Sequence, residues 1–267
     1  MRGRPISSVD EAAHDAGVRA SLEAYYTRYY RETLGIPRWP DHVANRLADQ
    51  PREKRRLARL EAATGRSARG LRLLNVGCGP GGFNLVASAA GARAVGIDAF
   101  DEAVAIAARR GADVLTAEAE RQPFRSGAFD LVYCYSTLEH VAGAAAAVSE
   151  MLRVLAPDGA LYLHLPHRWA CSEGHYKIFW VPGLPRWAGR LYLRARGRPP
   201  AFLDTLRPLS LGSVRRLVAR SGGRIVTVMD GAPRRTGGPL WPLVRAYYRL
   251  FGIRSDIEVV AVRPPGG

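Results

Sequence analysis

The chain has 267 residues, of which 47% are hydrophobic, enough for one substantial core with appendages. Its three cysteines, Cys78, Cys134 and Cys171, lack the paired spacing of a disulfide framework or a zinc site, so we expect a reducing compartment and no metal site. No signal-peptide pattern is visible, and no window approaches the roughly 20 apolar residues of a membrane span, which predicts a soluble, cytoplasmic protein.

The formal charge of +15 is concentrated in one part of the chain. Residues 1–150 contribute +2 and residues 151–267 contribute +13, nearly all of it from arginine. Arginine is suited to planar, paired contacts with carboxylates and phosphates. Two interpretations stay open: an ordinary solvated basic surface, or contact with an anionic substrate, membrane surface or nucleic acid.

Two helical stretches come first along the chain. Residues 8–34 place apolar and aromatic side chains at helical spacing and stop at a Gly-Ile-Pro sequence, which predicts an amphipathic helix. A second helix is predicted at about residues 41–64, followed by a linker at 66–70. We expect residues 1–70 to form a helical extension that covers the active site without carrying chemistry of its own.

From Leu71 onward, short apolar runs alternate with helical segments, which is the signature of a parallel sheet. Seven strands are predicted, at 71–76, 93–98, 113–116, 129–134, 159–165, 224–229 and 257–262. Helices are predicted at about 81–90, 101–110, 143–155, 210–221 and 242–251, the fourth capped by Ser210. A Gly/Pro/Arg loop, 231–239, precedes the last helix.

Residues 166–208 interrupt this alternation with aromatic, proline, glycine and arginine residues, and they are a candidate lid. The pattern therefore predicts an α/β fold: a Rossmann-like, seven-stranded, mostly parallel sheet with helices on both faces. An N-terminal helical extension precedes it, and the lid insertion follows the fifth strand. Residues 71–267 are expected to form one domain that includes this lid.

A glycine-rich segment at residues 73–83, Leu-Leu-Asn-Val-Gly-Cys-Gly-Pro-Gly-Gly-Phe, runs from a predicted strand into a predicted helix. Glycines allow close approach of the backbone to a ligand, and the helix N-terminus offers free N–H groups, so this is a nucleotide-cofactor loop. Gly77, Gly79 and Gly82 also satisfy the dinucleotide spacing, so the loop alone leaves the cofactor open.

The next predicted strand ends at Asp98, about 20 residues after the loop, where an acid can accept hydrogen bonds from ribose hydroxyls. The alternative is that Asp98 caps the helix that starts at Asp101.

Four ordered segments resemble the class I S-adenosylmethionine-dependent methyltransferases, specifically the UbiE-like group called methyltransferase type 11. They are the loop 73–83, the strand ending at Asp98, residues 118–124 with 129–132, and Leu138-Glu139-His140 with 153–159. The resemblance covers about residues 71–164. A nicotinamide-dependent dehydrogenase has no reason to carry the last two segments, so the resemblance favours S-adenosylmethionine as cofactor.

The resemblance implies that Gly77, Cys78, Gly79 and Gly81 surround the aminocarboxypropyl end of the cofactor. Asn75 stands where the family usually has an acid, so it can hydrogen-bond the cofactor amine but brings no charge.

The same resemblance implies that Asp98 and Ala99 hold the ribose and flank the adenine. Glu118 stands where the family usually has Asp, near the adenine amino group, with the backbone of Ala119 beside it. Tyr135, just past the fourth strand, is implied to lie near the methionine portion and the transferred methyl group.

A sulfonium methyl group is already activated, so the protein has to align an acceptor atom and exclude water. If the acceptor is a hydroxyl, a histidine can remove its proton, and His140 and His175 are the candidates for catalysis. The alternative for His140 is a structural role after a buried strand, and for His175 it is packing within the lid.

Aromatic residues and arginines occur together in residues 179–187 and 241–251, a combination typical of contact with an anionic membrane and also of ordinary packing.

The leading prediction is an enzyme that methylates a small-molecule, glycan or lipid-linked acceptor, with O-methylation favoured and an anionic acceptor included. The alternatives are an RNA methyltransferase and a non-catalytic cofactor-binding protein. The fourth strand ends Cys-Tyr-Ser-Thr and lacks the Asn/Asp-Pro-Pro motif that resembles base-methylating enzymes.

Overall fold

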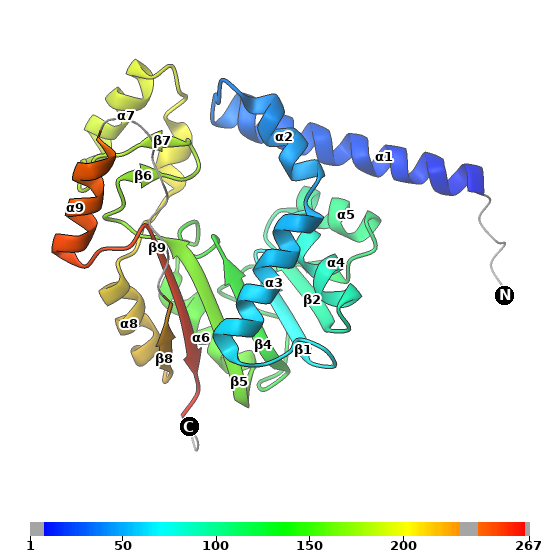
Figure 1. The fold of residues 1–267 in the computed structure, drawn as a ribbon. Coiled ribbons are helices and arrows are strands. Elements are labelled where there is room, and N and C mark those ends of the chain that lie inside the picture. Colours follow the sequence, from blue (N-terminus) through cyan, green and yellow to red (C-terminus); the bar gives the residue numbers. More distant parts are fainter. Residues whose placement is uncertain (1–7, 230–239, 265–267) are drawn as a thin grey trace, which may run out of the picture.

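The computed structural model describes residues 8–229 and 240–264. Its centre is a seven-stranded sheet of order β3-β2-β1-β4-β5-β9-β8 (Figure 1). The strands are β1 (Arg72–Val76), β2 (Arg93–Asp98), β3 (Val114–Thr116), β4 (Phe129–Tyr135), β5 (Leu155–Pro166), β8 (Arg224–Val228) and β9 (Asp256–Val262). All neighbours pair in parallel except β9, which is antiparallel to both β5 and β8. The predicted fold class is confirmed.

Helices precede, alternate with and follow these strands. They are α1 (Ser8–Thr27), the π-helical turn η1 (Arg28–Thr33), α2 (Trp39–Leu47), α3 (Gln50–Thr64), α4 (Gly82–Ala89), α5 (Asp101–Arg109), α6 (Ala144–Val154), α7 (Arg186–Ala195), the 3-10 helix η2 (Ala201–Thr205), α8 (Leu211–Arg220) and α9 (Trp241–Phe251). Ser210 caps α8 as predicted, because its hydroxyl accepts a hydrogen bond from Ser213 N. None of the described helices is long and apolar enough to cross a membrane.

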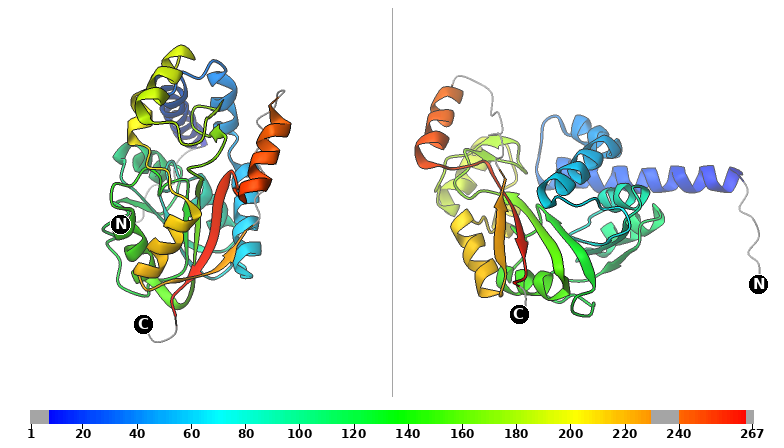
Figure 2. Two further views of the ribbon diagram at one scale, coloured as in Figure 1. Left: turned by 90° about the vertical axis from the view of Figure 1, so that its left-hand side faces the viewer. Right: turned by 60° about the horizontal axis from the view of Figure 1, so that its bottom comes forward.

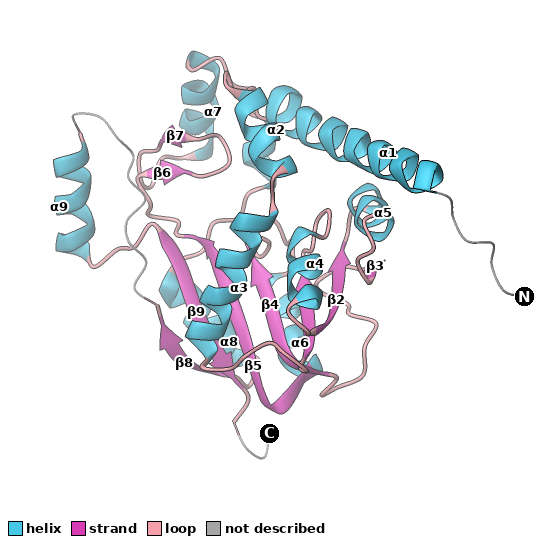
Figure 3. Cartoon of the chain, turned by 45° about the vertical axis from the view of Figure 1, so that its right-hand side comes forward, coloured by secondary structure: helices cyan, strands magenta, loops and turns pink. Residues whose placement is uncertain are grey.

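Each face of the sheet is buried against helices, because neighbouring residues of a strand point to opposite sides. On one face, Leu73 of β1 packs with Leu60 of α3 and Phe83 of α4. On the other face, Leu74 belongs to a cluster that includes Met151 of α6 and Val214 of α8. Figure 3 shows α3 in front of the sheet and α8 behind it. Two apolar layers therefore fix the ends of the strands, where the candidate site lies.

Several predicted elements differ in detail from the structure. The predicted helix at 41–64 is two helices, because α2 ends at Leu47 and Pro51 occupies the first turn of α3, a position that favours a new helix start. The fifth strand begins at Leu155, where it pairs with Phe129 before a shift of register. The predicted loop 231–239 lies outside the described residues.

The insertion 166–208 has more regular structure than its composition suggests. A small hairpin of β6 (Ser172–Glu173) and β7 (Ile178–Phe179) precedes α7 and η2. Figure 3 shows this hairpin, with α2 and α7, on the side of the sheet where β4 and β5 end. These short elements are held in place by packing of their aromatic and apolar side chains, and not by a long strand ladder.

We define the cap as α1, η1, α2 and the insertion 166–208. One apolar cluster joins its two parts: Tyr26, Tyr30 and Leu34 from the N-terminal helices pack with residues of the insertion such as Tyr176 and Leu203. α1 also lies on α5 and extends past that edge of the sheet (Figures 1 and 2). The assignment of residues 1–70 as a separate extension stays a prediction.

Candidate functional site

The turn between β1 and α4 depends on three glycines in the left-handed region. Gly77, Gly79 and Gly81 have φ angles of 77°, 50° and 79°, which other residues rarely adopt. A Cβ atom on Gly77 would lie 2.1 Å from Thr137 Oγ1, whereas one on Gly79 would meet no atom within 4 Å. Packing therefore requires glycine at position 77, and the backbone at Gly79 borders open space.

Asp98, the last residue of β2, is tied to this turn. Its Oδ2 accepts a hydrogen bond from Gly79 N at 2.8 Å, and its Oδ1 accepts one from Phe100 N at 3.0 Å. Burial raises the pKa of Asp98 despite these backbone hydrogen bonds, which favour the ionised form. Because a carboxylate oxygen has two lone pairs, Asp98 can accept further hydrogen bonds from ligand hydroxyls.

The alternative role of Asp98 as a helix cap is wrong, since Phe100 occupies the N-cap position of α5. Ala99 is exposed beside Asp98. The loop after β3 lies nearby, because Ala117 N donates to Asp98 O at 3.0 Å. In that loop Glu118 is exposed and Ala119 is buried.

Asn75 and Cys78 are buried near the start of α4. Asn75 Nδ2 donates to Asn84 Oδ1 at 2.7 Å, so its side chain faces this helix. The Nδ2 of Asn84 has no hydrogen-bond partner among the described residues. Burial raises the pKa of the Cys78 thiol, which keeps it protonated and chemically inert.

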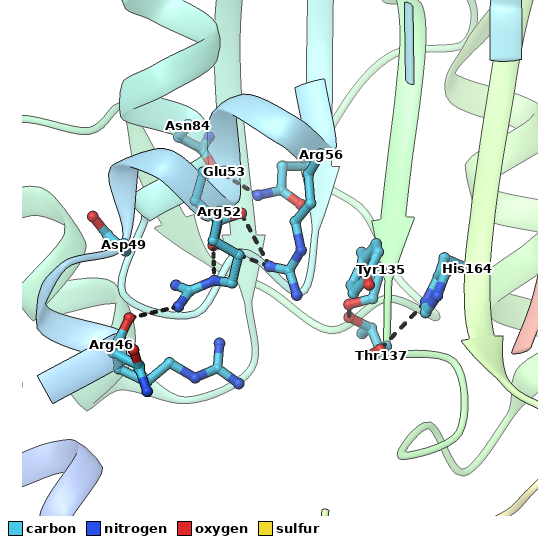
Figure 4. A network of polar contacts seen from close by, with 12 residues as sticks. Arg46, Asp49, Arg52, Glu53, Arg56, Asn84, Tyr135, Thr137 and His164 are labelled. Carbon is cyan, nitrogen blue, oxygen red and sulfur yellow. Dashed lines mark hydrogen bonds and ion pairs between the residues drawn. The ribbon is translucent and has the colours of Figure 1, made fainter. Parts of the chain in front are cut away.

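Tyr135, at the end of β4, belongs to an aromatic cluster. Its ring stacks on His164 with centroids 3.8 Å apart, and the Arg56 guanidinium lies 3.9 Å from its centroid. The chain then turns sharply, because Ser136 has a φ of 52° and donates its N–H to His164 O. Tyr135 and His164 therefore present one fixed aromatic surface (Figure 4).

Charged side chains of α3 approach the same region, and they were not predicted from the sequence. Glu53 is 4% exposed and accepts hydrogen bonds from Arg52 Nε at 2.7 Å and Arg56 Nη1 at 3.0 Å (Figure 4). Asp49, near the start of α3, pairs with Arg110 at 2.7 Å. The signal was the spacing of Glu53 and Arg56, which places both on one helix face, but a charged run usually indicates a solvated surface.

His140 and His175, predicted from distant segments, meet in the structure. Their Nε2 atoms lie 3.2 Å apart. His175 Nδ1 is 2.8 Å from Glu173 Oε1, and His175 Nε2 is 3.9 Å from Glu139 Oε1. The ring of Phe202 packs against both histidines, with centroids 5.6 Å and 5.4 Å away.

Burial dominates the ionisation of this histidine cluster. It raises the pKa of Glu139 to about 7 and lowers that of His140 to about 4, where the nearby charge of His175 adds to the effect. Burial also disfavours the charged form of Glu173, but its hydrogen bond to His175, the charge of His175 and two backbone hydrogen bonds together outweigh burial and lower the pKa of Glu173. His140 is therefore neutral near pH 7.

A cavity of about 320 Å³ opens beside the cluster. Glu139, Glu173 and His175 line it together with residues of the insertion, among them Trp180 and Arg186. The cavity thus combines ionisable groups with an apolar and basic wall, the composition expected of a small-molecule site.

Comparisons with known proteins point to one family. Residues 74–163 match the family model described as a methyltransferase domain. An uncharacterized methyltransferase of Mycolicibacterium vanbaalenii is 32% identical over 145 residues, which cover 52% of this chain and 56% of that protein. The chloroplastic tocopherol O-methyltransferase of Arabidopsis thaliana is 37% identical over 101 residues, which cover 34% of this chain and 29% of that protein. The chain thus spans less than two thirds of these relatives.

Residues 74–163 form a methyltransferase domain. The predicted family is confirmed. A solved structure, the cyclase SpnF, has a TM-score of 0.56 and 21% identity, covering 79% of this chain and 82% of that one, and it shows the fold alone. Since a cyclase shares this fold, the reaction has to be argued from the site.

The turn of the methyltransferase domain fits S-adenosylmethionine, the cofactor implied by the resemblance. Gly79 borders open space, and Asp98 has lone pairs for ribose hydroxyls. Arg52 and Arg56 bring guanidinium groups that suit a carboxylate. The roles of the individual predicted site residues stay predictions.

Proposed function

We propose that this chain is an S-adenosylmethionine-dependent methyltransferase that methylates an oxygen atom of a small-molecule, glycan or lipid-linked acceptor. The observation that carries the proposal is the glycine turn tied to Asp98 by the bond from Gly79 N, inside a segment that matches the methyltransferase family. This turn leaves open space where a cofactor can approach the backbone.

Bound S-adenosylmethionine supplies an activated methyl group. The chain has to hold that group, orient the acceptor and exclude water. Asp98 and the turn hold the nucleoside side, and the stacked pair Tyr135 and His164 forms a rigid wall next to it. The cap excludes water, because its apolar cluster joins the N-terminal helices to the insertion.

The cavity beside Glu139 and His175 is the proposed acceptor site. Oxygen as the acceptor atom is supported by the ionisable groups that line the cavity and by the relative named as a tocopherol O-methyltransferase. His140 and His175 remain the proposed catalytic residues. With its pKa lowered to about 4, His140 is a weak base, so His175 is the better candidate for proton removal.

A lipid-linked acceptor is supported by the surface of two helices. Trp187 and Leu191 of α7 are 66% and 55% exposed, and Leu250 and Phe251 of α9 are 79% and 63% exposed. Both helices also carry arginines. Exposed apolar residues flanked by arginine suit the interface of an anionic membrane, so we propose peripheral membrane contact.

Calorimetry with S-adenosylmethionine and NAD tests the cofactor. We expect binding of S-adenosylmethionine alone, and binding of NAD alone would overturn the proposal.

Transfer of a labelled methyl group into a cell extract, fractionated into lipid, glycan, RNA and small-molecule pools, tests the acceptor. Label confined to RNA would favour the RNA methyltransferase. Cofactor binding without label in any pool would favour the non-catalytic alternative.

Flotation with anionic and neutral vesicles tests the membrane contact. We expect flotation with anionic vesicles only, and weaker flotation for the double variant Leu250→Ser/Phe251→Ser. The variant Val226→Ser is the control, because Val226 is an exposed apolar residue (43%) that lies on β8 and outside both helices. No flotation with either vesicle would remove the proposed contact.

A further inference from the structure

Three side chains from the loop after β4 and from the β6–β7 hairpin converge as metal ligands do. One ligand atom each from Glu139, His140 and His175 lies within 4.8 Å of the others. The spacing of the cysteines predicted no metal site, but the ligands in this cluster are histidines and a carboxylate. Glu139 and His140 are adjacent, but His175 is 35 residues from His140, so only the folded chain brings the three together.

The hydrogen bonding of His175 directs a lone pair into the cluster. Glu173 Oε1, 2.8 Å from His175 Nδ1, belongs to a carboxylate, which can only accept, so the proton of the neutral ring is on Nδ1. Nε2 then carries a lone pair directed toward His140. A carboxylate that fixes the tautomer and orientation of a histidine in this way is the usual outer partner of a metal-bound histidine.

The separation of the two histidines matches shared coordination. At Zn–N distances near 2.0–2.1 Å, two ligands of a tetrahedral ion lie about 3.3 Å apart. The two Nε2 atoms are 3.2 Å apart. Glu139 Oε1, at 3.9 Å from His175 Nε2, needs only a small movement to complete a set of three.

Glu139 gives an independent indication of a ligand. Its side chain is 3% exposed, yet neither carboxylate oxygen has a hydrogen-bond partner within the part of the chain that the structure describes. A buried carboxylate is costly unless it is paired or coordinates a metal ion. A cation bound in the cluster would give these oxygens the partner that they lack.

We propose that Glu139, His140 and His175 bind a divalent first-row transition metal ion of the zinc class, with Glu173 as the positioning residue for His175. Two imidazoles and a carboxylate favour such ions over Mg²⁺ or Ca²⁺, which prefer oxygen ligands alone. Three protein ligands leave a coordination position open, as in catalytic zinc sites, and the adjacent cavity gives access to it.

The role of this metal rests on the proposed function. An acceptor hydroxyl at the open position would have its pKa lowered and would lose its proton to solvent near neutral pH. Its oxygen would then form a bond to the methyl carbon while the carbon–sulfur bond breaks and S-adenosylhomocysteine leaves. In this arrangement the metal ion replaces the histidine base of the proposed function, and His140 and His175 act as its ligands.

Metal binding can be tested without any acceptor. The full chain, purified without a polyhistidine tag and treated with chelator, is titrated with Co²⁺ and followed by its visible d–d absorption. We expect an intense spectrum that saturates at one equivalent and is lost on addition of Zn²⁺. A spectrum no stronger than that of aqueous Co²⁺ would overturn the proposal, whatever the result for S-adenosylmethionine.

Substitutions test which residues bind the metal ion. We expect His140→Ala and His175→Ala to weaken Zn²⁺ binding at least a hundredfold, and Glu173→Gln to weaken it about 10–100-fold. His167→Ala is the matched control, because His167 lines the same cavity outside the cluster. Calorimetry with S-adenosylmethionine checks that each variant is folded. Unchanged Zn²⁺ affinity in folded His140→Ala and His175→Ala, or equal loss in His167→Ala, would contradict the assignment.

Discussion

The methyltransferase domain and the cap are built in different ways. In residues 74–163, the functional groups lie at the ends of parallel strands that stand in the order β3-β2-β1-β4-β5, so motifs from different parts of the segment meet at one edge of the sheet. In the cap, the two parts come from opposite sides of the domain in the sequence and meet through scattered aromatic and apolar side chains. A local sequence motif is enough to predict the site of the first region, whereas the contacts within the cap are visible only in the folded chain.

The largest effect should come from Gly77→Ala. A Cβ atom there combines a left-handed backbone with a position 2.1 Å from Thr137 Oγ1, and we expect a loss of about 3–5 kcal/mol in the free energy of unfolding, together with loss of cofactor binding. Urea denaturation and calorimetry measure both. Gly127→Ala is the control, because Gly127 has a similar φ of 70° but open space around it, and about 1 kcal/mol is expected. Equal losses would refute the role of Thr137.

A large but more local effect is expected from Leu34→Ala in the cap. Leu34 is fully buried, and its truncation should cost about 3 kcal/mol. If the cap is a separate unit, amide hydrogen exchange should accelerate in α1, α2 and α7 but not in β1, β4 or β5. Leu191→Ala, also in the cap but 55% exposed, should change stability by less than about 0.5 kcal/mol. Equal acceleration in the sheet would show that cap and domain unfold together.

A smaller effect is expected from Asp98→Asn. The substitution keeps one acceptor oxygen but removes the charge that Gly79 N and ligand hydroxyls face, so affinity for S-adenosylmethionine should fall roughly 10–100-fold. Calorimetry measures the loss. Asp101→Asn, at the first position of α5, should leave the affinity within about twofold because Asp101 bonds to Thr116 and does not contact the turn. Unchanged affinity in Asp98→Asn would remove Asp98 from the cofactor site.

The smallest effect concerns the opposite end of the sheet. Arg72 pairs with Asp130 at 2.6 Å, and this bond holds the pKa of Asp130 below its usual value. The stabilisation is therefore present above the unfolded pKa of about 3.9 and is lost as the pH falls through the lower folded pKa. Asp130→Asn should cost about 1 kcal/mol or less at pH 7, without changing cofactor affinity, and this cost should vanish under strongly acidic conditions. A constant cost at all pH values would contradict an ionic origin.

The contrast between the two regions also explains which parts of the fold and of the site could be predicted from the sequence. The glycine turn and Asp98 were predictable, because a strand, a turn and an acid at the next strand end follow from local patterns. Glu53 and Arg56 were missed, because a charged helix face gives no sign in sequence that it will be covered. His140 and His175 were each predicted as candidate catalytic residues. Their 3.2 Å separation could not be predicted, because it depends on a hairpin whose strands are only two residues long.

The shared apolar cluster of the cap has a consequence for biosynthesis. Arg198 bonds to Gly35 across 163 residues of sequence, and the buried partners of the N-terminal helices lie in that same late segment. During translation, α1 and η1 leave the ribosome before the insertion and expose their tyrosines until the insertion has been made. These helices, although synthesised before the insertion, must therefore be among the last parts to reach their final packing, and they need protection from aggregation in the meantime.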